Sequence, residues 1–171
     1  NNALSNLEIP NTVTSIGASA FSKNALTTII IPDSVVSIGD YAFFENTSME
    51  SVVLPDGLVS VGYAAFYNNA LSNLEIPNTV TSIGAFAFGG NDTLLSISFS
   101  GARPILSDTS FSSNPNLIRV NYCSGMSGWP GLAISAGINS VIPVEDCDGD
   151  NVTDADDAFP LDDSEQTDTD S

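Results

Sequence analysis

The chain has 171 residues, of which 42% are hydrophobic, and it contains 13 glycines and 9 prolines. This composition is typical of a folded, turn-rich protein and argues against a disordered chain. Its formal net charge of −18 repels phosphate backbones and anionic lipids, which excludes nucleic acid and membrane surfaces as expected partners. No apolar run approaches the length of a membrane span, so membrane insertion is not expected either.

A repeated unit organises most of the chain. The first copy reads LSNLEIPNTVTSIGASAF, and the next three follow at steps of 22, 23 and 22 residues. A fifth copy is eroded and a sixth is incomplete. The copies begin at Leu4, Leu26, Met49, Leu71, Leu94 and Leu117. Self-similarity at this period predicts a solenoid, in which each repeat forms one coil that cannot bury its apolar face alone.

Within each copy, two apolar columns alternate with polar residues, which predicts a short strand. The columns are Leu7, Ile29, Val52, Leu74, Ile97 and Val120, and Ile9, Ile31, Leu54, Ile76, Phe99 and Tyr122. Stacked coils would place these strands side by side in a parallel sheet. We also expect the leucine or methionine that begins each copy to be buried. A proline follows each of the first four strands and ends it, because proline supplies no ladder N–H.

Three further columns complete the coil. They are Gly17, Gly39, Gly62 and Gly84; Phe21, Phe43, Phe66, Phe88 and Phe111; and Asn2, Asn24, Asn46, Asn69, Asn91 and Asn114. The glycines predict either a backbone conformation closed to other residues or a very tight corner. The phenylalanines predict a stack of rings in the core. The asparagines predict hydrogen bonds to the turn backbone. Asn46 and Asn91 also match the glycan-acceptor motif, but the turn role accounts for the whole column.

The consensus LxxLxIPxxVxxIGxxAFxxN resembles the bacterial leucine-rich repeat of the BspA-like type over residues 1–122. The resemblance implies a mainly β repeat solenoid, a right-handed horseshoe with a parallel sheet on its concave side and short strands or helical turns on its convex side. It also implies an extracellular or bacterial cell-surface location. In the fifth copy, Ser100 and Ser107 replace the expected proline and glycine. We therefore expect this copy to begin a C-terminal cap that residues 123–144 complete.

The composition becomes strongly acidic in residues 145–171. Oxygen ligands at loop positions 1, 3, 5, 7, 9 and 12 suit a calcium ion. In this chain they would be Asp146, Asp148, Asp150, the Val152 carbonyl, Asp154 and Asp157. The segment also resembles the calcium-binding repeats of thrombospondin type 3, and Asp168 and Asp170 match the start of a second, truncated loop. The alternative is an acidic, disordered tail that keeps the protein soluble.

Cys123 and Cys147 are the only cysteines. An isolated pair in a protein of the surface type most simply forms one disulfide, which here would tie the cap to the calcium loop.

Two surfaces of the solenoid are candidate ligand-binding sites. On the face of the predicted sheet, Ile30 and Val53 would form a small apolar centre flanked by Glu8 and Glu75. Where the coil turns into its phenylalanine column, a second group of aromatic residues gathers: Tyr41, Phe44, Tyr63, Tyr67 and Phe86. Exposed aromatics on adjacent coils can bind sugar rings or a partner protein. The alternative is that they only cover the edge of the core.

The sequence therefore predicts a non-catalytic binding or adhesion module, whose partner is a protein or glycan on another surface. The alternative is a structural spacer or a subunit of a surface filament that self-associates through its coil ends. A serine ladder at positions 15, 37, 60 and 82 also raises ice binding, although its neighbours are not uniform. An enzyme is not expected, because the chain contains no histidine and no nucleophile beside a suitable base.

Overall fold

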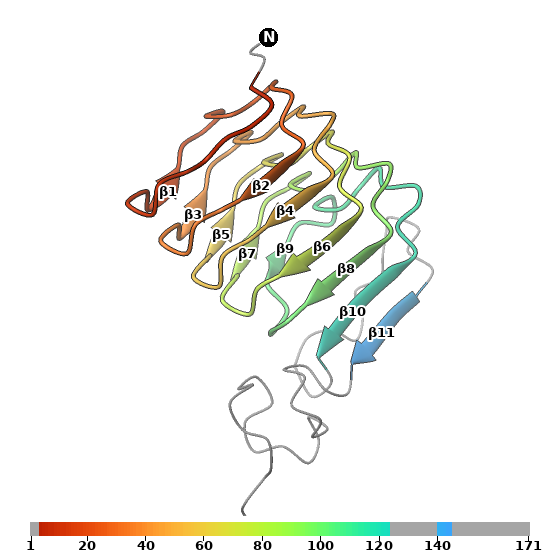
Figure 1. The fold of residues 1–171 in the computed structure, drawn as a ribbon. Helices are drawn as coiled ribbons and strands as arrows, with labels where there is room; N and C mark the ends of the chain where they lie inside the picture. Colours follow the sequence, from red (N-terminus) through yellow and green to blue (C-terminus); the bar gives the residue numbers. More distant parts are fainter. Residues whose placement is uncertain (1–3, 124–139, 145–171) are drawn as a thin grey trace, which may run out of the picture.

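The computed structural model describes residues 4–123 and 140–144. These residues form a mainly β solenoid of about five turns, with its strands stacked in parallel (Figure 1). We number its coils from the one that begins at Leu4. The predicted repeat solenoid is confirmed. The part of the chain that the structure describes holds no helix capable of spanning a bilayer.

Five longer strands fall where the alternating apolar columns predict them, and a sixth, β11, lies beyond these columns. They are β2 (Thr28–Ile30), β4 (Ser51–Val53), β6 (Asn73–Ile76), β8 (Ser96–Phe99), β10 (Arg119–Cys123) and β11 (Ser140–Val144). In the first copy, Leu7 and Ile9 do not lie in a strand, so the prediction is wrong there. β2 pairs with β4, and β6, β8, β10 and β11 form a four-stranded sheet. The register keeps the column intact, because Leu74 lies opposite Ile97 and Ile97 lies opposite Val120. Each coil therefore adds its apolar side chains directly over those of the previous coil.

The last strand, β11, belongs to the stretch expected to form the cap. It pairs in parallel with β10, and Pro143 takes the position opposite Tyr122. Proline is tolerated there because β11 is the edge strand of this sheet in the described residues. This strand lacks the repeat consensus, yet it extends the sheet by one further position.

A second, five-stranded sheet runs along the other side of the coils (Figure 1). Its strands are β1 (Ser15–Ile16), β3 (Ser37–Ile38), β5 (Ser60–Val61), β7 (Ser82–Ile83) and β9 (Ile105–Leu106). The predicted serine ladder is part of this sheet, with Ser15 opposite Ser37 and Ser60 opposite Ser82. The eroded fifth copy also contributes a strand to this sheet, because Ile105 in β9 lies opposite Ser82 in β7.

The phenylalanine column forms the predicted stack between the two sheets. Successive ring centroids from Phe21 to Phe111 lie 5.4, 5.1, 5.2 and 5.8 Å apart. The expectation that Leu4 is buried is wrong, because 44% of it is exposed, whereas Leu26 is fully buried. Leu4 belongs to the first described coil and packs against a neighbouring coil on one side only.

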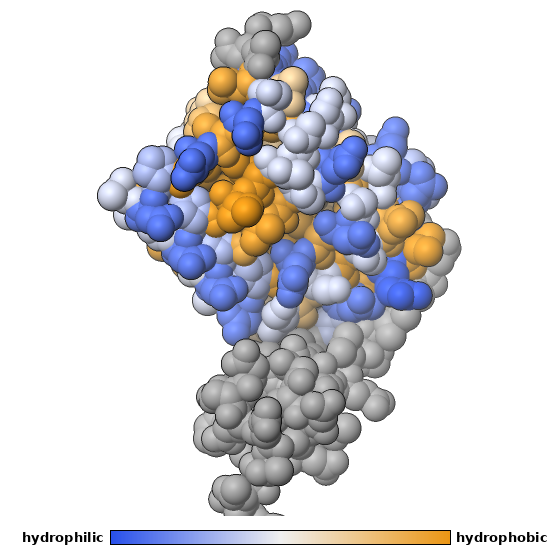
Figure 2. Space-filling model, viewed as in Figure 1, coloured by the Kyte–Doolittle hydropathy of each residue, from blue (hydrophilic) through white to orange (hydrophobic). Residues whose placement is uncertain are grey.

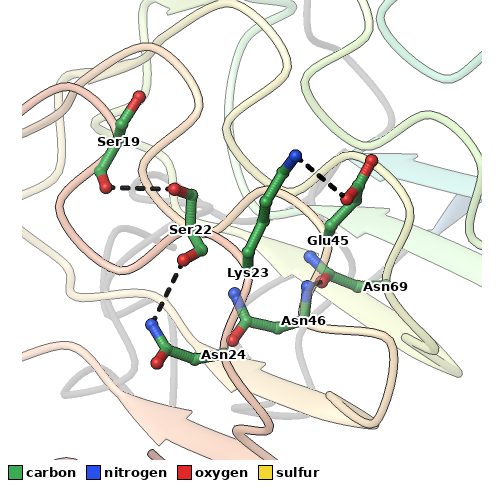
Figure 3. A network of polar contacts seen from close by, with 7 residues as sticks. All are labelled: Ser19, Ser22, Lys23, Asn24, Glu45, Asn46 and Asn69. Atoms are coloured by element: carbon green, nitrogen blue, oxygen red, sulfur yellow. Dashed lines mark hydrogen bonds and ion pairs between the residues drawn. The ribbon is translucent and has the colours of Figure 1, made fainter. Parts of the chain in front are cut away.

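From Asn24 to Asn114 the asparagine column forms the predicted ladder at the coil corner, and Asn2 lies outside the described residues (Figure 3). The side-chain amide of Asn46 donates to the carbonyl oxygens of Phe21 and Phe43 at 3.0 and 2.9 Å. Its backbone N–H donates to Oδ1 of Asn69 at 2.8 Å, which links one coil to the next. Asn46 and Asn91 are both 0% exposed. Their amide nitrogens are therefore inaccessible to glycan attachment, and the turn role is confirmed.

The glycine column reflects close approach between coils. A Cβ added to Gly62 would lie 2.7 Å from the backbone nitrogen of Asp40 in the preceding coil. None of these glycines has a positive φ. The prediction of a backbone conformation closed to other residues is therefore wrong, and the prediction of a tight corner holds. Left-handed backbone instead recurs at non-glycine residues, namely Ser19, Tyr41, Ala64 and Phe86 in one column and Lys23, Glu45, Asn68 and Ser113 in another.

Candidate aromatic groove

The turn after the short-strand sheet brings the predicted aromatic residues together. They come from three consecutive coils and, with Ala64, line a groove of about 310 Å³. We call this the aromatic groove; it is lined by Tyr41, Phe44, Tyr63, Ala64, Tyr67 and Phe86. Tyr41 and Tyr63 are each 39% exposed, and the remaining rings are half-buried. The groove therefore presents ring surface to solvent while its base packs against the solenoid.

One small side chain creates the space. Tyr41, Ala64 and Phe86 occupy the same place in the second, third and fourth coils, two residues after the glycine column. Because coil stacking puts equivalent side chains over one another, Ala64 leaves a gap between two large rings. Ala64 itself is 3% exposed. Sequence reasoning found the aromatic residues but missed this alanine; its signal is a small residue between Tyr41 and Phe86 in one column of the repeat.

The rings border the groove from several directions. Tyr41 meets Phe44 at an interplanar angle of 82° and Tyr63 at 63°, with centroids 5.4 and 5.2 Å apart. Phe86 meets Tyr63 at 75° and Tyr67 at 81°. Within this group only Phe44 and Tyr67 stack, at 15° and 5.8 Å. The side chains therefore form walls at steep angles to one another instead of one flat platform.

Inter-coil hydrogen bonds hold this turn in a left-handed conformation. The φ angles are 58° at Tyr41, 50° at Ala64 and 58° at Phe86. This conformation costs an L-residue about 1–2 kcal/mol. The backbone N–H of Tyr41 donates to the carbonyl of Tyr63 at 2.8 Å, and that of Ala64 donates to Ala85 at 2.9 Å. The same bond repeats from coil to coil, so the solenoid fixes the backbone that carries the rings.

Charged groups stand at the edges of the aromatic groove. Oδ1 of Asp40 accepts the backbone N–H of Tyr63 at 2.8 Å. Desolvation raises the pKa of Tyr41, and nearby Tyr63 and Asp40 raise it further. On the side of the first coil, the ammonium of Lys23 lies 5.8 Å from the Phe44 ring centroid. The same ammonium lies 3.6 Å from Oε2 of Glu45 (Figure 3). The Tyr41 hydroxyl therefore stays neutral at physiological pH, and the nearest fixed charges are two carboxylates and one ammonium.

The second predicted surface lies on the face of the longer strands. Ile30 and Val53 are opposite each other in the register of β2 and β4, and they are 71% and 55% exposed. Figure 2 shows apolar surface gathered over these two strands, with polar residues around it. Glu8 lines one depression with Ile30, and Glu75 lines another with Val53. Ile30 and Val53 therefore lie side by side on the exposed face of the longer strands, as the sequence predicts.

The same repeat geometry appears in known proteins. The family model described as the BspA type leucine rich repeat region matches residues 14–133 in six copies. The chain belongs to this family. The resemblance read from the repeat consensus is therefore confirmed, and this family consists of repeat proteins that are typically non-catalytic. No curated protein matches the chain.

Several solved structures share the fold. A leucine rich cell surface protein of Faecalibacterium prausnitzii is 27% identical, with a TM-score of 0.68 over 80% of this chain and 36% of that one. The leucine rich repeat protein of T. pallidum is 26% identical, with a TM-score of 0.58 over 64% of this chain and 52% of that one. The pneumococcal vaccine antigen PcpA, 19% identical with a TM-score of 0.61 over 79% and 40%, shows likeness of fold alone. This BspA-type chain thus spans about half or less of the relatives' own length.

The predicted calcium ligands, residues 146–157, lie outside the described residues, as does Cys147. Calcium binding and the disulfide from Cys123 therefore remain predictions. Within the part that the structure describes, this BspA-type solenoid has no group of three or more His, Cys, Asp or Glu placed to hold a metal ion.

Proposed function

We propose that this chain is a non-catalytic binding module of the bacterial cell surface, and that its aromatic groove holds a partner protein or glycan presented on another surface. Membership of the BspA-type family and the likeness to a cell surface protein support the location. The observation that carries the binding role is the groove of about 310 Å³ that rings from three coils line together with Ala64. A group that only covered the core would not need this open space.

Preorganisation supports the same proposal. The rings of the aromatic groove already contact one another at centroid distances of 5.2 to 6.2 Å. Their backbone is held by hydrogen bonds between coils. Fewer side-chain rotamers are therefore lost when a ligand enters, and this loss is one of the main costs of association. The groove lining contains no nucleophile beside a base, which is consistent with binding without catalysis.

A variant whose side chain fills the aromatic groove tests this proposal most directly. Ala64→Phe places an aromatic side chain on a left-handed backbone, a conformation that Phe86 already adopts at the equivalent position of the next coil. The matched control is Ser19→Phe, which adds the same ring at the equivalent position of the first coil and leaves the aromatic groove open. Binding is measured on arrays of glycans and of surface proteins, with circular dichroism as a check on folding.

We expect wild type and Ser19→Phe to bind the same array members, and Ala64→Phe to lose them. If all three proteins bind alike, the aromatic groove is not the contact surface. If wild type binds nothing and its mass rises with concentration, the filament subunit explains the chain better than the binding module.

The acidic segment supplies a second, separable part of the proposal. Calcium bound by Asp146, Asp148, Asp150, Val152, Asp154 and Asp157 would stabilise residues 145–171, since carboxylate and carbonyl oxygens are the ligands that Ca²⁺ prefers. Titration calorimetry should show heat with Ca²⁺ that the double variant D148N/D150N removes. Equal heats for both proteins would contradict the assignment. A disulfide between Cys123 and Cys147 predicts that no thiol is titratable before reduction.

A further inference from the structure

We infer that the group held in the aromatic groove is the ammonium end of a lysine side chain carried by a partner protein. The inference rests on the proposed function and narrows its ligand. Four features of the groove support it: the angles between its rings, its size, the charges at its edges, and a cation that the chain itself already places over one ring.

The ring angles favour a compact cation over a sugar ring. A sugar stacks its flat apolar face on one open aromatic face, whereas the walls here meet at 63° to 82°. An ammonium group has no flat face, and it is attracted to each ring whose face it approaches within about 6 Å. Rings that surround a space from several directions therefore add their attraction for a cation but leave little room for a stacked sugar.

The size of the groove suits one side chain. Its volume of about 310 Å³ lies at the lower end of the roughly 300–1,000 Å³ found for small-molecule sites. Lysine carries a compact charge on a flexible stem, so its ammonium can enter a narrow space while the stem contacts the ring edges. The planar guanidinium of arginine stacks best flat on one ring, whereas these rings stand at 63° to 82° to one another.

The charges near the aromatic groove favour a cation. Asp40 and Glu45 stand beside it, and Glu45 pairs at 3.6 Å with Lys23, a cation at the edge of the groove. Because Lys23 pairs with Glu45, it does not neutralise the negative charge of the Asp40 carboxylate. The net charge of −18 also attracts positively charged proteins over a longer range.

The chain itself already places one ammonium over a ring of this group. Lys23 bends over the Phe44 face that points to the first coil, while Tyr67 stacks at 5.8 Å and 15° to Phe44 from the third coil. Lys23 does not line the groove. It thus leaves the space free, and as a like charge at the edge it should weaken the binding of an external cation.

The test is an NMR titration of the full chain with labelled tyrosine rings. The probe is Nα-acetyl-lysine methylamide, and its matched neutral form carries a second acetyl group on Nε, which removes the charge and keeps the stem. Methyl β-glucoside is the sugar probe. We expect the lysine probe to shift the ring signals of Tyr41, Tyr63 and Tyr67, and the acetylated probe to bind at least about threefold more weakly.

Charge variants separate a cation site from an apolar one. Asp40→Asn retains the Oδ1 acceptor for the Tyr63 N–H but removes the charge, so we expect about two- to fivefold weaker binding of the lysine probe. Asp33→Asn makes the same change in net charge at an exposed residue outside the groove and should have no effect. Lys23→Gln should strengthen binding. Tyr63→Leu keeps apolar surface without the ring and should weaken binding about tenfold.

Equal binding of the charged and acetylated probes, or identical affinities of wild type, Asp40→Asn and Lys23→Gln, would overturn the lysine assignment. Shifts of the same ring signals by methyl β-glucoside and not by the lysine probe would also overturn it, but would leave the binding role of the groove intact. If no probe shifts these signals and Ala64→Phe changes no binding on the arrays, both the inference and the proposed function fail.

Discussion

Replacing Asn91 by alanine tests whether the asparagine ladder holds the coils together. Asn91 is fully buried, and its side-chain nitrogen donates to the carbonyl oxygens of Phe66, Phe88 and Gly89 at 3.1, 3.0 and 3.3 Å. Its Oδ1 accepts the backbone N–H of Leu71 at 3.2 Å. Alanine removes all of these bonds and leaves their backbone partners buried.

The expected loss of stability follows from these bonds. A buried hydrogen bond contributes about 1 kcal/mol net, and a buried group left without a partner costs about 1–3 kcal/mol. The NH₂ group has two hydrogens for three carbonyl acceptors, so it makes about two effective hydrogen bonds. With the bond that Oδ1 accepts, Asn91 loses about three effective bonds on mutation to alanine. Asn91→Ala should therefore lower the free energy of unfolding by about 3–5 kcal/mol. This is a large share of the roughly 5–15 kcal/mol typical of a folded protein.

Urea unfolding followed by circular dichroism measures this difference. The control is Asn73→Ala, which removes an exposed asparagine whose Oδ1 accepts only the hydroxyl of Ser96 at 2.7 Å. An exposed site of this kind should change stability by no more than about 0.5 kcal/mol. If the two variants unfold at the same urea concentration, buried amide hydrogen bonds do not hold the coil corners, and the ladder is only a consequence of repeat duplication.

Three further predictions concern the core, the coil spacing and the groove. Phe66→Ala removes a fully buried ring that stacks on both neighbouring coils and should cost about 3–5 kcal/mol in urea unfolding, whereas Phe66→Leu should cost far less. Gly62→Ala should lower the melting temperature by several degrees, because its Cβ would approach the backbone nitrogen of Asp40 to 2.7 Å; Gly17→Ala, with nothing within 4 Å, should not. The raised pKa of Tyr41 stabilises the folded state below pH ~10, and this contribution is lost as pH rises through the folded-state pKa. Tyr41→Phe should therefore flatten the alkaline fall in stability, and an unchanged profile would contradict that assignment.

The repeat pattern is enough to predict the architecture, because equivalent residues of a repeat must lie over one another once the coils stack. A 22- or 23-residue period was enough to predict the phenylalanine stack from Phe21 to Phe111 and the buried amides of Asn46 and Asn91. Positions in one column share one environment, so several copies report on the same structural role. The aromatic residues of the groove were identified on the same ground.

The contacts between coils set features that a single column of the repeat does not show. The role of Gly62 depends on how closely two coils approach, and the left-handed backbone at Tyr41 and Phe86 depends on hydrogen bonds from each coil to the next. The open space at Ala64 and the steep ring angles around it arise from side chains of three coils acting together. Repetition fixes which residues are neighbours, whereas rotamers, turn conformation and the gaps between rings are set only when those neighbours pack.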